Sequence, residues 1–175
     1  IWIGTRNGLN KINKDDMTIE KYKVEDGLID NNIKGLFIDE KNNLWIGTPI
    51  GLTVLNIETN EITDFTSRLI KAGIKEPYVR TVYEDKDEDG VYWIGGYISE
   101  GLIKFDINKD TIEMYSKYEE NGKQVIVNTI RTIVEDEENN LWIGTNSGLL
   151  KFNKIDKKFK SYTEKDGLAN NIVYQ

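Results

Sequence analysis

Six residues in the middle of the chain have the spacing of a calcium-binding loop. They read Asp85-Lys86-Asp87-Glu88-Asp89-Gly90. Alternate carboxylates in a tight loop can direct their oxygens at one hard cation, and a glycine allows the sharp turn. The distal ligand positions of such a loop are held by Trp93 and Gly96, which offer no carboxylate. We therefore favour a polar hairpin turn without metal or cofactor, and keep as the weaker alternative a calcium site at Asp85, Asp87 and Asp89.

Residues suited to catalysis are scarce. The chain contains no His, so no imidazole is available for general base catalysis or metal ligation. Two carboxylate pairs, Glu84-Asp85 and Glu135-Asp136, stand at the ends of predicted strands, where we expect solvated turns rather than a cleft. We predict a protein that is not an enzyme. The alternative is a carboxylate-based propeller hydrolase or lyase, which would need two acids facing one cleft.

Charge and hydropathy narrow the class of partner. The net charge of −7 and the pI near 4.8 argue against nucleic acid and anionic membrane surfaces as general partners. No apolar run approaches the ~18 residues of a membrane span, so we expect no membrane insertion by this segment. The chain begins inside a repeat and without Met, which we interpret as a piece of a longer protein.

A tryptophan motif recurs about every 45 residues, which is the spacing of a repeat architecture. At Trp45 and Trp142 it reads Leu-Trp-Ile-Gly-Thr-x-x-Gly-Leu; the copy at Trp2 begins with Ile, and the copy at Trp93 is stretched by two residues. These copies contain all four tryptophans of the chain. We expect these side chains to pack against neighbouring repeats rather than stack on a sugar, with Trp45, Trp93 and Trp142 largely buried.

Between the motifs, short apolar segments alternate with polar turns, which predicts four-stranded antiparallel units. Such units form the blades of a β-propeller, so we predict an all-β fold with about four blades' worth of repeats, a fragment of a larger array. The one predicted helical turn lies near Ser67 to Lys75. The predicted bounds are strands b, c and d of a first blade at 1–23, blades at 33–65, 79–115 and 130–162, and a lone strand a at 171–175.

The two open ends leave two ways to complete the first blade. The lone strand a could pair with the first strand of the same chain and close a four-bladed ring, or it could pair with a second copy. We favour the second outcome, which predicts a homo-oligomer.

The repeats resemble the two-component regulator propeller repeat. The likeness rests on the tryptophan motif, on the preceding Glu135 to Asn140, and on the Asp-Gly-Leu segments beginning at Asp26 and Asp166. It implies a sensor module in a periplasmic or extracellular domain of a bacterial two-component histidine kinase, where such propellers are associated with oligosaccharides or other small polar ligands. An assembly or dimerisation module without a small ligand is the alternative. Propeller lyases that are distantly similar would rely on a His, which this chain lacks.

Departures from the repeat locate a candidate ligand site. Basic residues occupy one equivalent position at the start of strand a, and the loops before strand a and between strands b and c vary in length. In a propeller these loops emerge on one face, where aromatic and planar polar groups suit a sugar or a carboxylated ligand. Drift of solvated loops is the competing interpretation. The candidate ligand-binding residues are Lys34, Arg68, Lys71, Tyr78, Arg80, Tyr97, Glu100 and Arg131.

Overall fold

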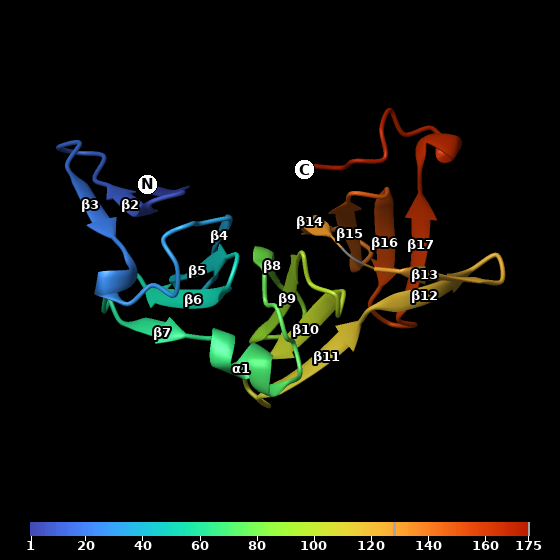
Figure 1. Ribbon diagram of the computed structural model, residues 1–175, viewed down its shortest axis with the longest axis horizontal. Coiled ribbons are helices and arrows are strands. Elements are labelled where there is room, and N and C mark those ends of the chain that lie inside the picture. The colour runs from blue at the N-terminus through green and yellow to red at the C-terminus, as the bar shows by residue number, and fades with distance from the viewer. Residues whose placement is uncertain (128, 175) are drawn as a thin grey trace. The chain divides into compact units, whose positions relative to one another are not determined.

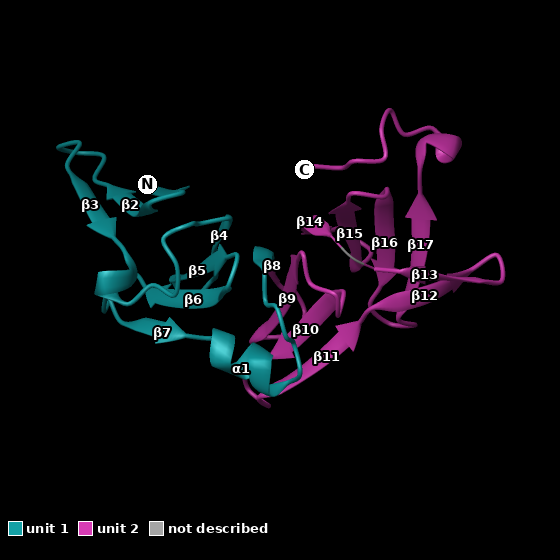
Figure 2. Cartoon of the chain, in the orientation of Figure 1, with its two compact units in different colours: residues 1–82 teal, residues 83–175 magenta. Residues whose placement is uncertain are grey.

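The structure is a computed structural model that describes residues 1–127 and 129–174 (Figure 1). The chain divides into two units, Ile1–Val82 and Tyr83–Gln175, coloured separately in Figure 2. The boundary falls inside strand β8 (Val79–Glu84).

The first unit contains a three-stranded and a four-stranded antiparallel sheet. The three-stranded sheet has the order β1-β2-β3, and the four-stranded sheet has the order β4-β5-β6-β7. A single α-helix, α1 (Thr66–Lys71), follows β7, and a 3-10 turn (Val24–Asp26) follows β3. The strands are β1 (Trp2–Thr5), β2 (Gly8–Ile12), β3 (Ile19–Tyr22), β4 (Gly35–Ile38), β5 (Asn43–Thr48), β6 (Gly51–Asn56) and β7 (Ile62–Asp64).

The second unit continues the four-stranded pattern. Its sheets have the orders β11-β10-β9-β8 and β14-β15-β16-β17, and a two-stranded hairpin, β12-β13, lies between them in the chain. A 3-10 turn (Glu164–Asp166) follows β17. The strands are β9 (Val91–Gly96), β10 (Leu102–Asp106), β11 (Thr111–Tyr115), β12 (Lys117–Glu120), β13 (Lys123–Ile126), β14 (Ile130–Glu135), β15 (Asn140–Thr145), β16 (Leu149–Asn153) and β17 (Lys158–Tyr162).

In each of the three four-stranded sheets the tryptophan motif forms the second strand in chain order, and apolar side chains are buried on both faces of that strand. In β5, for example, Leu44 and Ile46 are fully buried on one face while Trp45 is buried on the other. The motif at Trp2 forms β1, the first strand of the three-stranded sheet, and is mostly exposed. One hydrophobic cluster in the core of the first unit consists of Leu9, Leu28, Ile33, Leu44, Ile46 and Leu55. One in the core of the second unit consists of Trp93, Leu102, Val127, Ile130, Ile133, Leu141, Ile143, Leu150 and Phe152.

Trp142 is less buried than expected. Trp45 and Trp93 are each 1% exposed, whereas Trp142 is only partly buried. Trp93 contacts Phe152 of the following blade at a ring distance of 5.5 Å, while the aromatic ring beside Trp142 is Tyr162 of its own blade, at 5.6 Å. Among the described residues no further blade covers Trp142, which explains its exposure.

Two predicted segments fold differently from expectation. The loop predicted between Tyr115 and Ile130 contains the hairpin β12–β13, while the strand predicted at 171–175 is not formed by residues 171–174, and Gln175 lies outside the described residues. That segment makes a single strand-like hydrogen bond, from the Val173 N–H to the Thr145 carbonyl oxygen at 2.9 Å. The helical turn predicted near Ser67 is confirmed as α1.

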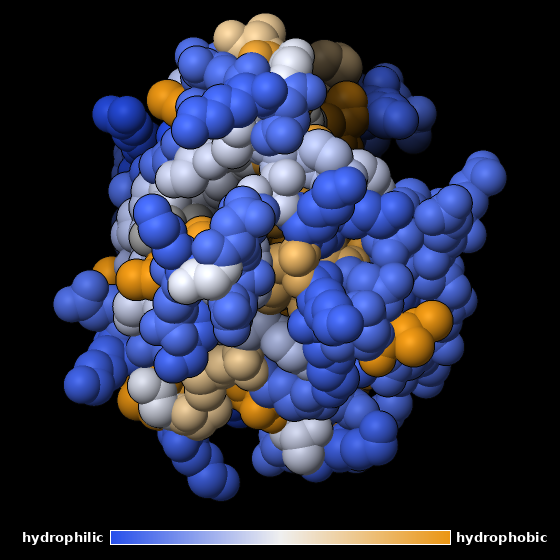
Figure 3. Space-filling model, turned by 90° about the vertical axis from the view of Figure 1, so that its right-hand side faces the viewer, coloured by the Kyte–Doolittle hydropathy of each residue, from blue (hydrophilic) through white to orange (hydrophobic). Residues whose placement is uncertain are grey.

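The surface agrees with the acidic, polar composition. Hydrophilic side chains cover most of the face drawn in Figure 3, and hydrophobic ones are scattered among them. Within the described part of the chain, no helix combines the length and the hydropathy needed to cross a bilayer.

Candidate ligand-binding surface

The first aspartate of the calcium-like loop holds a tryptophan in place. The Asp85 carboxylate accepts a hydrogen bond from Trp93 Nε1 at 2.7 Å and further bonds from the backbone N–H groups of Asp87 and Glu88. The equivalent aspartates do the same, with 2.9 Å between Trp45 Nε1 and Asp39 and 2.8 Å between Trp142 Nε1 and Asp136. These Asp–Trp clamps satisfy the indole N–H inside the blade and fix the turn between the first two strands.

A lysine from another turn occupies the centre of the acidic cluster. Lys154 Nζ lies 3.0 Å from Asp85 and 3.4 Å from Asp87, and it also bonds Glu135. The three carboxylates that lie close enough to share a cation are Asp85, Asp87 and Glu135. The sequence pattern had predicted Asp89 in place of Glu135. The ammonium group of Lys154 supplies the positive charge that these carboxylates require when buried.

The pKa values in this cluster follow from burial and pairing. Burial alone would raise the pKa of Asp85, but the hydrogen bonds that it accepts from Trp93 and Lys154 lower it. Burial alone would lower the pKa of Lys154, but its hydrogen bonds to Glu135 and Asp85 raise it. The pKa of Asp85 is lowered and that of Lys154 is raised, so both groups stay charged near neutral pH. Burial, reinforced by the charge of Glu135, raises the pKa of Tyr83 to about 12. Asp85 and Glu135 are thus buried acids that share the ammonium group of Lys154, whereas Asp87 is about half exposed.

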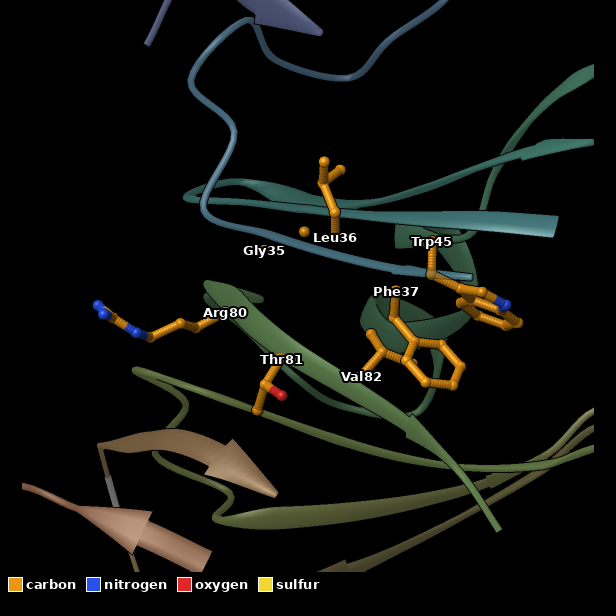
Figure 4. A pocket seen from close by; sticks show the side chains of 8 residues that line it. Gly35, Leu36, Phe37, Trp45, Arg80, Thr81 and Val82 are labelled. Atoms are coloured by element: carbon orange, nitrogen blue, oxygen red, sulfur yellow. The ribbon is translucent and has the colours of Figure 1, made fainter. Parts of the chain in front are cut away.

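In the first unit the basic position at the start of strand a brings two cations to adjacent segments. Lys34 precedes β4, and Arg80 lies in β8. The two backbones approach so closely that a Cβ on Gly35 would stand 1.9 Å from the Arg80 carbonyl oxygen. Figure 4 shows the Arg80 side chain extending away from Phe37 and Val82, which line the tightly packed seam. Within the described residues, neither cation forms an ion pair with a carboxylate.

The same position in the second unit is held by Arg131. Its Nε donates a hydrogen bond to Asn146 Oδ1, and its guanidinium lies 4.6 Å from the centre of the Tyr174 ring. Val173 bonds Thr145 as Ile33 bonds Thr5, so Tyr174 stands at the position that Lys34 occupies in the first unit. Arg131 is therefore held by an amide and an aromatic ring, which leave its positive charge uncompensated.

The remaining predicted site residues are divided between the units. In the first unit Arg68 and Lys71 lie on α1, with the Arg68 guanidinium 4.7 Å from the Phe65 ring, and Tyr78 is half-buried just before β8. In the second unit Tyr97 is 40% exposed and Glu100 accepts a hydrogen bond from Ser99, both between β9 and β10. Together with the strand-a cations, five predicted residues belong to the first unit and three to the second.

Sequence reasoning missed a pocket beside the hairpin β12–β13. It lies in the second unit, and its volume is about 130 Å³. The missed signal is Asn121-Gly122, because Asn-Gly between two alternating segments predicts a two-residue hairpin. The pocket is lined by Tyr118, Glu120, Val125, Ile126, Thr145, Ser147, Leu150, Ser161 and Thr163.

Comparison with known proteins agrees with this architecture. Residues 27–49 and 124–147 match the family model described as two component regulator propeller. The chain is 32% identical, over 98% of its length, to Histidine kinase P4 of Formosa agariphila. It is also similar to the extracellular domain of a hybrid two-component system from B. thetaiotaomicron, with 28% identity over 92% of the chain and a TM-score of 0.74. The extracellular domain of a one-component system from the same organism has the same fold, with a TM-score of 0.77 and 18% identity over 99% of the chain.

The antiparallel four-stranded sheets and these structural neighbours define the class as a β-propeller of nearly all-β composition. The chain contains two-component regulator propeller repeats, matched at residues 27–49 and 124–147. It spans 12% of the histidine kinase that it matches and 22% of each of the two extracellular domains.

Proposed function

We propose that this chain is a non-enzymatic ligand-sensing module of a bacterial two-component receptor, placed in its periplasmic or extracellular part. The similarity to a histidine kinase and to the extracellular domain of a hybrid two-component system supports this role. The Lys154 network supports the absence of catalysis, because its buried acids are paired rather than poised to exchange protons.

The observation that carries the proposal is that each unit, taken by itself, has uncompensated cations at the starts of the strands named a. Lys34 and Arg80 in the first unit, and Arg131 in the second, hold positive charge on a chain whose net charge is −7. Planar guanidinium groups bind carboxylates in a bidentate manner, and the Tyr174 ring beside Arg131 can stack on a sugar ring. An oligosaccharide, in particular one that carries carboxylates, is the ligand class that suits these groups.

Thermal unfolding in the presence of neutral and uronic acid-containing oligosaccharides tests the proposal. A ligand that binds only the folded state raises the melting temperature with ligand concentration. The double variant Lys34→Gln/Arg80→Gln should lose most of this increase, while its own stability changes by no more than about 0.5 kcal/mol. Lys21→Gln, an exposed substitution on β3, is the matched control and should respond like the wild type.

Two outcomes would contradict the proposal in different ways. If oligosaccharides raised the melting temperature of the double variant as much as that of the wild type, Lys34 and Arg80 would not belong to the ligand site. A melting temperature that follows protein concentration, and no oligosaccharide, would favour an assembly module instead.

A further inference from the structure

The hairpin β12–β13 forms one wall of the pocket, with a defined turn at its tip and a buried residue at its base. Asn121 and Gly122 both have positive φ, 52° and 72°, as a type I′ turn requires. The Tyr118 ring lies 5.3 Å from the Phe159 ring, and Val127 at the base of the hairpin is fully buried in the core. A ligand entering the pocket therefore meets a formed site and has little chain to order.

Most hydroxyl groups in the pocket are already engaged. Thr145 Oγ1 donates to the Gly148 carbonyl oxygen at 2.8 Å, and Thr163 Oγ1 donates to Asp166 at 3.0 Å. Ser161 Oγ donates to Glu120 Oε1 at 2.6 Å. Within the part of the chain that the structure describes, the second oxygen of Glu120 and the Ser147 hydroxyl have no protein partner.

The charge of the pocket is negative and unpaired. Glu120 is its one titratable carboxylate, and the lining residues include no lysine or arginine. Ser161 orients the carboxylate without neutralising it, because a hydroxyl donor carries no charge. Val125, Ile126 and Leu150 supply the apolar part of the lining, which we call the apolar wall. A half-buried carboxylate with a free oxygen is best satisfied by a charged donor.

We infer that this pocket binds a small organic ammonium group, with the cation on Glu120 and Ser147 and the body of the ligand against the apolar wall. An ammonium ligand differs in charge from the carboxylated ligand proposed for the strand-a cations, so this is a second site that does not depend on the proposed function. The volume of about 130 Å³ is below the roughly 300–1,000 Å³ of sites for drug-sized ligands, so one ring or a short chain fits. An amino sugar and an alkylamine share this chemistry.

The inference is tested by titrating the intact chain with three small molecules at pH 6 and measuring their binding by NMR. Glucosamine and n-butylamine carry the ammonium group on different bodies, and N-acetylglucosamine is the neutral counterpart of the first. Both amines should shift the amide signals of residues 118–126 and 145–147, and N-acetylglucosamine should not. Binding of glucosamine alone would assign the site to amino sugars, and binding of both would assign it to simple amines.

Glu120→Gln keeps the shape of the carboxylate and removes its charge, so affinity for both amines should fall by about tenfold or more. Glu119→Gln is the matched control, since Glu119 is the exposed neighbour on the same strand. Glu120→Asp keeps the charge and should retain part of the affinity. Equal binding by Glu120→Gln, equal binding of N-acetylglucosamine, or no binding of either amine would each overturn the inference.

Discussion

The residue type at individual positions in these repeats depends on how closely neighbouring backbones approach and on whether buried polar groups find hydrogen-bond partners. Gly35 is one example, because the Arg80 carbonyl oxygen occupies the space that a side chain would need. Its backbone is not in the left-handed region, so the requirement for glycine here comes from packing alone.

Gly35→Ala should therefore lower the free energy of unfolding by about 1–3 kcal/mol through overpacking. Gly73→Ala is the informative comparison, because its Cβ would meet nothing within 4 Å while its φ of 100° strains any side chain. We expect a cost of about 1 kcal/mol there. Urea denaturation measures both, and a neutral Gly35→Ala would show that the seam can relax.

The Asp–Trp clamp predicts acid sensitivity. Burial alone would raise the pKa of Asp85, but bonds from Trp93 and Lys154 lower it. A carboxyl group whose pKa is depressed on folding stabilises the protein above its unfolded pKa, near 3.9, and this contribution is lost as the pH falls below that value.

Asp85→Asn should destabilise the protein at pH 7 and should flatten the fall in unfolding free energy below about pH 4. Asp156→Asn, in an exposed turn, should leave the pH dependence unchanged. Denaturant titrations at a series of pH values provide the measurement. Parallel wild-type and Asp85→Asn curves would show that other carboxylates govern acid unfolding.

At the scale of elements, turns from different sheets are joined by the Lys154 network. Lys154 follows β16, Asp85 follows β8, and Glu135 ends β14. The lysine side chain is 9% exposed, and both carboxylates are fully buried. Removing one partner of such a network leaves buried charges without compensation.

Lys154→Met should cost about 3 kcal/mol of unfolding free energy, since Asp85 and Glu135 would lose their shared cation. Lys157→Met removes an ion pair to Glu113 whose side chains are about half exposed, and should cost less than about 1 kcal/mol. Chemical denaturation of the two variants compares a buried pair with an exposed one. Equal costs would mean that solvent reaches the Lys154 network.

On the scale of the whole molecule, the first sheet has an unpaired edge at β1. Ile1 and Ile3 are 58% and 42% exposed there, and β1 pairs with β2 alone in its sheet. Exposed apolar edge strands promote pairing with another chain. We therefore predict that copies of the chain associate through the edge of β1.

Light scattering should give a mass that rises above 20.2 kDa with protein concentration. Ile1→Lys/Ile3→Lys should keep the chain monomeric, because charged residues block edge pairing. Ile155→Lys is the control, since Ile155 is 86% exposed but lies in a turn. A wild-type monomer at high concentration would contradict the association and leave closure within one chain as the alternative.

Much of the fold could be predicted from the sequence because its signals are local. Alternating apolar residues, tight polar turns and the tryptophan motif predicted an all-β fold of four-stranded antiparallel units, and the described residues form three such sheets. The Asn121-Gly122 turn was an equally local signal, and its hairpin was missed because the segment was interpreted as a lengthened loop. The strand expected at the C-terminal end is absent from residues 171–174 because no neighbouring strand pairs with it.

The partnerships between side chains were decided by the tertiary structure. Lys154 and Asp85 are 69 residues apart, and they meet only because two sheets of the second unit place their turns together. Stacking likewise buries Trp93 against Phe152 while Trp142 stays partly exposed, although both stand in the same motif. The pocket at Glu120 depends on how a hairpin lies against β17. Sequence periodicity specifies which face of a strand is apolar, whereas the groups that meet across that face depend on the packing of segments distant in the chain.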